Sequence, residues 1–308
     1  MSRRTVLENT MATDPVPRKE VSRLLQKFWA EVQEMLFPTW QDCSCCQDSL
    51  AQNGRSWGRS GLCRNCLLEI ERLNEELVQC DRCGKYLKEA PSSKEPLLKE
   101  SSARARKEKG TESVICENCQ NQAPLFLQAW NIGPYEGLLR QAIHDLKYKG
   151  RRDLALPLGK IMAQQLWLAV PNSSLLNPWG DLKGAFLVPI PLYSEKLLRR
   201  NFNQSFLLAK AIEEETAFPV ADILLRQADT ETQAHLGRYD RLRNLEGQFV
   251  LQPQGLLGQK GSKTKAKAAI LVDDVYTTGA TVTEATKVLH QAGITSVYVV
   301  TAAAGIGL

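Results

Sequence analysis

The cysteines constrain the fold of this chain of 308 residues most strongly, because eight of the nine form four CxxC pairs, all before residue 120. The pairs are Cys43 with Cys46, Cys63 with Cys66, Cys80 with Cys83, and Cys116 with Cys119. A CxxC knuckle places two thiolates on one Zn²⁺, and two knuckles complete a tetrahedral site. The sequence therefore predicts two zinc ions, and the simplest arrangement pairs the knuckles in sequential order.

Other roles for these cysteines fit the pattern less well. Disulfides are rare in a reducing compartment, and redox-active CxxC pairs seldom occur four at a time. Cys45 lies inside the stretch CSCC and competes for the first ion, so Cys46 is assigned by its spacing alone. A site with four cysteine ligands has no coordination position left for a substrate. We therefore expect both zinc ions to be structural.

The end of the cysteine-rich region marks the main predicted domain boundary. Residues 1–19 are polar and predicted to be disordered, and residues 20–123 are predicted to contain a leading helix and the zinc module. Residues 124–308 contain no cysteine and are predicted to form a second domain. Charge-rich loops are predicted at 90–111 in the first region and at 255–267 in the second.

Composition and hydropathy bear on where the protein works. No apolar run approaches the roughly 18 residues needed to cross a membrane. The first residues contain arginines without the apolar core of a signal peptide. We therefore expect a cytoplasmic protein without membrane insertion. The formal net charge of +5 is mild, and it favours polyanions without demonstrating that any is bound.

Strand-like and helical patterns alternate in the second domain. Apolar runs occur in GAFLVPIPL at 184–192, PVADILL at 219–225 and SVYVVTAA at 296–303, and FLLAKAIEEE at 206–215 has a helical pattern. Such alternation is typical of a mainly parallel sheet with helices on both faces. The predicted fold class is therefore α/β, with a smaller zinc module before it.

One predicted strand-to-helix turn has the clearest binding chemistry. The apolar run at 268–272 ends in Asp273 and Asp274, and a helical pattern follows that stops at Gly293. Ligands of open α/β sheets lie beyond the carboxyl ends of strands, where a helix N-terminus offers N–H groups to an anion. The hydroxyl-rich loop is predicted to hold a monophosphate, and the carboxylates to bind sugar hydroxyls or Mg²⁺. A ribose 5-phosphate satisfies both features, whereas the alternative is an ordinary turn in which Asp274 is solvated or caps the helix.

The stretch AILVDDVYTTGATVTEA resembles the PRPP-binding signature of type I phosphoribosyltransferases. This resemblance implies that Asp273 and Asp274 contact the ribose hydroxyls and that the following loop surrounds the 5-phosphate. The loop residues are Thr277, Thr278, Gly279, Ala280 and Thr281. Purine-salvage relatives carry an aspartate where Thr277 stands, and a threonine cannot accept a proton there at neutral pH. The acceptor substrate therefore stays open.

Three more segments, together with the zinc module, resemble the ComF family of competence-associated phosphoribosyltransferase-like proteins. They are IHDLKYKGRRDLALPLG, VPIPLYSEKLLRRNFNQSFLLA and QADTETQAHLGRYDRLRNLEGQF, and the resemblance runs from about residue 36 to residue 304. It implies a pyrophosphate loop after an early strand, with a ComF motif beside it. The implied residues are Pro189, Ile190, Pro191, Leu192, Arg200, Asn203 and Gln204. Asn201 replaces the family's usual glycine, but asparagine tolerates left-handed backbone geometry better than most residues.

The arginine-rich segment supplies the remaining implied site residues. Arg238 and Arg241 match the family there and are expected to act in catalysis together with Asp273 and Asp274. We expect the segment 230–247 to be a polar lid that closes over a bound ligand.

The resemblance also implies ligands and partners. These are PRPP or a related sugar phosphate with Mg²⁺, single-stranded DNA, a DNA-uptake helicase and a second copy of the chain. Two hypotheses about function follow. The chain is an enzyme that exchanges groups at C1 of ribose, or it is a non-catalytic accessory protein whose zinc module and basic runs at 104–109 and 260–267 bind single strands. Charge runs are more often solvated loops than binding sites, and a purely structural interaction protein is a third possibility.

Overall fold

The computed structural model describes six stretches of the chain. They are residues 42–49, 61–88, 113–169, 182–227, 247–252 and 268–307. The predicted disordered N-terminus and leading helix, both charge-rich loops, and most of the arginine-rich segment with Arg238 and Arg241 lie outside these residues. All the described residues belong to one compact unit.

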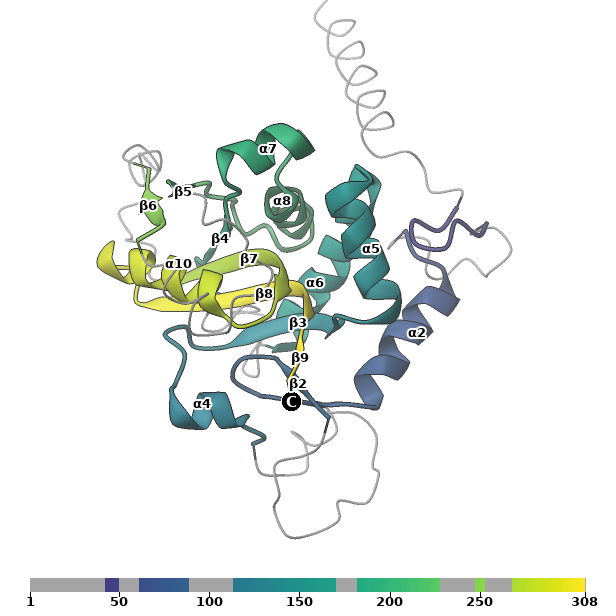
Figure 1. Cartoon of the computed structure of the whole chain (residues 1–308), viewed down its shortest axis with the longest axis horizontal. Helices are drawn as coiled ribbons and strands as arrows, with labels where there is room; N and C mark the ends of the chain where they lie inside the picture. Colours follow the sequence, from purple (N-terminus) through teal and green to yellow (C-terminus); the bar gives the residue numbers. More distant parts are fainter. Residues whose placement is uncertain are drawn as a thin grey trace, which may run out of the picture. The chain divides into compact units, whose positions relative to one another are not determined.

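A parallel sheet of four strands forms the centre of this unit (Figure 1). The strands are β3 (Ala129–Pro134), β4 (Phe186–Pro189), β7 (Ala268–Tyr276) and β8 (Ser296–Ala304), in the spatial order β3-β8-β7-β4. Every neighbouring pair is parallel. The sequence prediction of a mainly parallel sheet is therefore confirmed.

Helices pack on both faces of the sheet, as predicted. They are α5 (Gly137–Tyr148), α6 (Ala155–Ala169), α8 (Gln204–Thr216) and α10 (Ala280–Gln291). The 3-10 turn η1 (Arg152–Leu154) connects α5 to α6, and α7 (Ser194–Arg200), which precedes α8, has no buried residue. Alternate residues of β7 point to opposite faces: Ile270 joins a core with α5, α6 and α8, whereas Leu271 joins a core with α10. A short antiparallel pair, β5 (Leu224–Arg226) and β6 (Phe249–Leu251), lies on the α10 side.

Strand β7 is longer than the sequence indicates. The apolar run predicts a strand that ends before Asp273, but β7 continues to Tyr276 because its last residues pair with Ala303 and Ala304 of β8. The two carboxylates therefore lie within a rigid strand, and the loop before α10 shortens to Thr277–Gly279.

The cysteine region forms two ribbons. The first contains a bridge between Asp42 and Ser49 and the helix α2 (Arg64–Glu75). The second contains β1 (Val78–Gln79), β2 (Tyr86–Leu87) and α4 (Glu117–Asn121). We refer to them as the first and the second ribbon.

The second ribbon shares its sheet with the end of the α/β region. After β8 the chain continues into β9 (Ile306–Gly307), which pairs in parallel with β2. Asn131 of β3 also donates a hydrogen bond to the carbonyl of Gly84, 2.8 Å away. The predicted boundary after residue 123 thus falls between two regions that are joined by strand pairing and a shared core.

None of the described helices combines the length and the apolar character that a membrane span requires.

Candidate functional site

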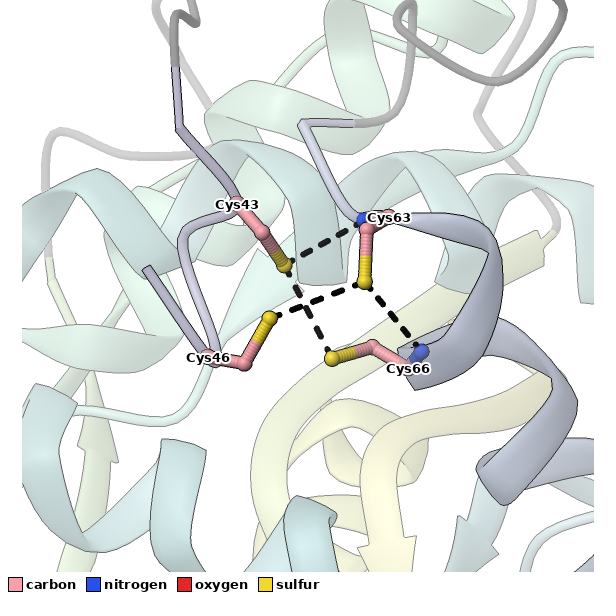
Figure 2. A group of neighbouring side chains, drawn as sticks. All are labelled: Cys43, Cys46, Cys63 and Cys66. Carbon is pink, nitrogen blue, oxygen red and sulfur yellow. Dashed lines mark hydrogen bonds between the residues drawn. The ribbon is translucent and has the colours of Figure 1, made fainter. Parts of the chain in front are cut away.

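The first ribbon brings together four cysteine side chains (Figure 2). The Sγ atoms of Cys43 and Cys66 lie 3.7 Å apart, and those of Cys46 and Cys63 lie 3.6 Å apart. Local structure fixes this arrangement, because Cys63 is the N-cap of α2 and the backbone N–H of Cys66 donates to its sulfur at 3.5 Å. The group matches the predicted first site.

The second ribbon holds the other predicted group. Cys80, Cys83, Cys116 and Cys119 place their sulfurs within 4.8 Å of one another, and all four residues are buried. The sulfurs of Cys83 and Cys116 are 3.7 Å apart. Sequential pairing of the knuckles is therefore confirmed.

The sulfur spacing fits a tetrahedral metal site. Zn–S bonds of about 2.3 Å place neighbouring sulfurs of a tetrahedron about 3.8 Å apart, close to the 3.6–3.7 Å separations in both groups. Each four-cysteine group therefore has the donor set and the geometry to hold one structural ion such as Zn²⁺.

Cys45 does not belong to the first group. Its sulfur is not among those that converge there, although Cys45 lies between Cys43 and Cys46 in the sequence. Burial, followed by the nearby charges of Cys43 and Cys46, raises the pKa of Cys45 to about 12. The assignment of Cys46 by spacing therefore agrees with the geometry, because its sulfur, and not that of Cys45, converges with those of Cys43, Cys63 and Cys66.

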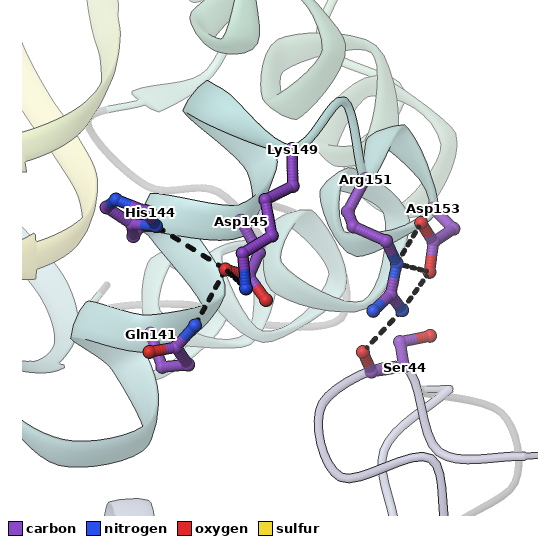
Figure 3. A network of polar contacts seen from close by, with 7 residues as sticks. All are labelled: Ser44, Gln141, His144, Asp145, Lys149, Arg151 and Asp153. Atoms are coloured by element: carbon purple, nitrogen blue, oxygen red, sulfur yellow. Dashed lines mark hydrogen bonds and ion pairs between the residues drawn. The ribbon is translucent and has the colours of Figure 1, made fainter.

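An arginine attaches the first ribbon to the α/β region (Figure 3). Arg151 donates from Nη2 to the carbonyl of Ser44 at 2.8 Å, and Asp153 holds the same guanidinium through contacts of 2.6 Å and 2.9 Å. Beside it, the carboxylate of Asp145 accepts from Gln141 at 2.7 Å and pairs with Lys149 at 3.0 Å. Ser44 belongs to the first knuckle, so the loop that carries two ligands is tied to the segment after α5.

The carboxylate pair Asp273 and Asp274 is joined by a lysine that the sequence analysis did not identify. Nζ of Lys147, near the end of α5, lies 2.7 Å from Oδ1 of Asp274, and both side chains are largely buried, with 17% and 12% exposure. Burial alone would lower the pKa of Lys147, but the charge of Asp274 raises it above its ordinary value. Asp274 is thus a buried carboxylate with a cationic partner, and the alternative of a solvated or capping side chain is wrong.

Asp273 is held from two sides. Its Oδ1 accepts a hydrogen bond from Ser205 Oγ at 3.0 Å and from the backbone N–H of Asp274 at 2.9 Å. Desolvation and the charge of Asp274 raise the pKa of Asp273 to about 7, while Lys147 and the hydrogen bonds oppose this rise. The orientation of Asp273 therefore depends on Ser205, at the start of α8.

Asn203 connects this helix to the predicted pyrophosphate loop. It is the N-cap of α8, where its Oδ1 accepts from the N–H of Ser205 at 3.0 Å, and its Nδ2 donates to the carbonyl of Ile190 at 3.0 Å. The N–H of Ile190 in turn donates to Val272 of β7 at 2.9 Å. Hydrogen bonds thus connect the N-terminus of α8 both to the loop after β4 and to the carboxylate of Asp273.

Other residues of the ComF motif have distinct surroundings. Asn201 ends α7 with φ of 60° and ψ of 16°, so the expected left-handed geometry is confirmed. Arg200 stacks on the ring of Tyr148, 5.0 Å from its centroid. Gln204 is fully buried, and neither atom of its amide has a hydrogen-bond partner among the described residues.

The loop between β7 and α10 has the geometry of an anion cradle. Gly279 is the N-cap of α10 with φ of 81°, which favours glycine, and Thr278 Oγ1 accepts from the N–H of Ala280 at 3.4 Å. Gly279 is also required by a close contact, because a Cβ there would lie 2.3 Å from the hydroxyl oxygen of Tyr276. Thr277, Thr278, Gly279 and Ala280 therefore present the helix N-terminus immediately after the carboxylates.

Known proteins provide an independent comparison. No protein-family model matches the chain. It is 31% identical over 193 residues to the DNA utilization protein YhgH of Salmonella typhi, a match that covers 62% of this chain and 78% of that protein. It is 26% identical over 243 residues to competence protein F of Haemophilus influenzae, covering 78% of this chain and 89% of the relative.

A more distant match extends to another bacterium. Competence protein ComFC of Bacillus subtilis is 23% identical over 186 residues, covering 58% of this chain and 68% of the relative. The match to the Salmonella typhi protein exceeds 30% identity and covers more than two thirds of that protein, and competence protein F and ComFC are further relatives of this chain. The two four-cysteine groups of this chain fit the zinc module expected from the resemblance to the ComF family. On these grounds the chain belongs to the ComF family.

Proposed function

We propose that this chain binds PRPP or a related ribose 5-phosphate together with Mg²⁺ at residues 273–281, in a process linked to DNA uptake. The observation that carries the proposal is the convergence of Asp273 and Asp274 with the N-termini of α8 and α10 at the carboxyl end of β7. Helix N-termini favour anions, and carboxylates bind sugar hydroxyls. A sugar that carries phosphate groups matches both.

The individual residues have separate tasks in this proposal. Asp273 and Asp274 bind the ribose hydroxyls, and the N–H groups of residues 278–281 bind the 5-phosphate. The loop after β4 binds the diphosphate with Arg200 and Gln204. The amide of Gln204 is buried and has no hydrogen-bond partner in the described part of the chain, which supports this role because such a group costs about 1–3 kcal/mol unless a ligand or water satisfies it.

The metal chemistry depends on the same carboxylates. Oxygen ligands suit Mg²⁺, and Asp273 and Asp274 offer them directly or through water. When bound, the ion would neutralise charge on the diphosphate. Lys147 already neutralises Asp274 in part, which limits repulsion between this carboxylate and an anionic ligand.

Calorimetric titration with PRPP and Mg²⁺ tests the binding proposal. We expect Asp274→Asn to weaken binding at least ten-fold, about 1.4 kcal/mol, and to reduce its dependence on Mg²⁺. Asp222→Asn, which changes a carboxylate outside the loop, is the matched control and should bind like the unmodified chain. Unchanged affinity in Asp274→Asn, with thermal unfolding showing that it is folded, would remove the proposed site.

Catalysis is a separate claim from binding. Transfer at C1 of ribose releases pyrophosphate, so release in the presence of a candidate acceptor would establish a phosphoribosyltransferase. Binding of PRPP without release for any acceptor would favour a protein that recognises a sugar phosphate without transforming it. Arg238 and Arg241 lie outside the described residues, and their proposed catalytic role is tested by Arg241→Gln in the same assay.

The second candidate function is a non-catalytic accessory protein that binds single-stranded DNA. It is favoured by relatives named for DNA utilization and competence. Contacts with phosphates would be independent of sequence and would weaken steeply with salt. Fluorescence anisotropy with a labelled single strand across salt concentrations tests this. Binding that persists in Asp274→Asn would place the DNA surface away from the sugar site, and absence of binding would reject the accessory function.

A further inference from the structure

Tyr276 lies between the second four-cysteine group and the proposed phosphate loop. It is the last residue of β7, three residues before Gly279, and only 7% of it is exposed. Its hydroxyl oxygen is so close to Gly279 that a Cβ there would approach it to 2.3 Å. The side chain of Tyr276 therefore packs directly against the backbone of the loop at Gly279.

Tyr276 also adjoins the second ribbon. A cavity of 370 Å³ is lined by Cys83 and Cys119 of the metal group and by Tyr276 and Thr278. The ring of Phe126, which follows α4, packs edge-on against the ring of Tyr276 with centroids 6.1 Å apart. One side chain thus adjoins the metal ligands and the loop.

The backbone makes a second connection between the same regions. The carbonyl of Tyr276 accepts from the N–H of Gly305 at 2.7 Å, and the carbonyl of Gly305 accepts from the N–H of Tyr86 at 3.3 Å. Tyr86 begins β2 of the second ribbon. Two hydrogen bonds therefore connect the ribbon to the end of β7, in addition to the packing of Tyr276.

The first four-cysteine group provides an internal contrast. Its residues pack in the core with α5, α6 and α8, whereas Tyr276 and the second group belong to the core on the other face. Arg151 of the α/β region donates a hydrogen bond to the carbonyl of Ser44, which lies in the knuckle of Cys43 and Cys46. Of the two groups, the second lies on the side of the sheet that supports the phosphate loop.

We propose that Tyr276 is a positioning residue that couples metal binding at the second ribbon to ligand binding at the phosphate loop. The inference rests on the proposed sugar-phosphate site. Because linkage between two binding free energies is reciprocal, a ligand in the loop must strengthen metal binding at the second group by the factor by which the metal strengthens ligand binding. We expect the stronger binding to appear as slower loss of metal, because the ligand stabilises the arrangement from which the metal leaves. Loss of that metal must in turn lower the affinity of the loop for the ligand.

The experiment measures zinc release to a chromogenic chelator from the full zinc-loaded chain. The probe is ribose 5-phosphate, since it lacks the diphosphate that would itself bind zinc. Release from the second group is identified as the phase that is missing in Cys116→Ser. We expect saturating ribose 5-phosphate to slow this phase about five-fold or more, which corresponds to coupling at the lower end of the usual range acting entirely on the release rate. Release of zinc from the first group should stay unchanged.

Variants separate coupling from general stability. Tyr276→Leu should bind ribose 5-phosphate more weakly and lose the protection of the second zinc, whereas Tyr276→Phe, which removes only the hydroxyl against Gly279, should keep part of both. Tyr298→Leu is the matched control, because Tyr298 lies on the neighbouring strand and stacks on Trp130 with centroids 5.5 Å apart. In this variant, ribose 5-phosphate should slow release of the second zinc as much as in the unmodified chain.

Each outcome bears on one claim. If calorimetry shows that ribose 5-phosphate binds but the second zinc leaves at the same rate, the coupling is overturned. Full protection in Tyr276→Leu would overturn the role of Tyr276. If ribose 5-phosphate does not bind to the unmodified chain, the inference is overturned, and the proposed function fails with it only if PRPP with Mg²⁺ does not bind either.

Discussion

Lys147 shows how one residue controls the charge of the candidate site. Two adjacent carboxylates at the end of a buried strand repel each other, and desolvation adds to the free-energy cost of ionising both. The ammonium group 2.7 Å from Asp274 offsets this cost. Lys147 therefore allows the strand to keep two acidic side chains where a sugar is expected to bind.

The pair supports a prediction about stability. Lys147→Met should lower the free energy of unfolding by about 3–5 kcal/mol, because it leaves a buried carboxylate without its partner. The double change Lys147→Met with Asp274→Asn should recover most of this loss. Urea unfolding measures both, and Lys160→Met, which breaks a more exposed contact of 3.6 Å with Glu215, should cost less than about 1 kcal/mol. Equal losses in the single and the double variant would show that the ion pair is not the cause.

At the level of elements, the second ribbon is expected to rely on metal because its own strands and helix are short. The strands β1 and β2 have two residues each, and α4 has five. Elements this short cannot fix their own conformation. An ion held by its four buried cysteines would fix these elements, so binding of the metal and folding of this ribbon are expected to be coupled.

Elemental analysis tests the metal content directly. Protein purified without chelator should contain two zinc ions per chain, and Cys45→Ser should also contain two because Cys45 lies outside the first group. Cys46→Ser should contain one tightly held ion. A chelator should unfold the ribbons before the parallel sheet, as monitored by hydrogen exchange. One zinc or none in the unmodified chain would contradict the prediction.

The sequence predicted the elements whose signals are local. The CxxC spacing identified both four-cysteine groups, and alternation identified the parallel sheet. The resemblance to the ComF family identified the turn at Asn201, and the conformational tolerance of asparagine explained why the turn persists without glycine. Contacts between distant residues left no such signal. The helical pattern around Lys147 does not reveal that this lysine meets Asp274, and the two residues of β9 are too few to indicate a strand. The role of Tyr276 likewise appears only when the ribbon is placed beside β7.

At the scale of the whole molecule, β9 joins the zinc module to the α/β region. Its pairing with β2 gives the second ribbon a third strand. Removing Gly305 and the residues after it should therefore destabilise the second ribbon, which is distant from them in sequence.

Truncation after Ala304 tests this dependence. We expect faster hydrogen exchange at Tyr86, whose N–H loses its acceptor on Gly305, and weaker zinc retention in the second group. Exchange in β3 and β4 should change little, because their partners β8 and β7 stay in place. Unchanged protection at Tyr86 would show that β9 does not stabilise the ribbon.

The pairing of β9 with β2 also sets an order of events during synthesis. The second ribbon emerges from the ribosome before the four strands of the parallel sheet, whereas its third strand emerges after them. During that interval the ribbon can gather its four thiolates around an ion but cannot complete its sheet. Metal capture is thus the step that can keep this region in a native-like arrangement on the nascent chain until its partner strand has been made.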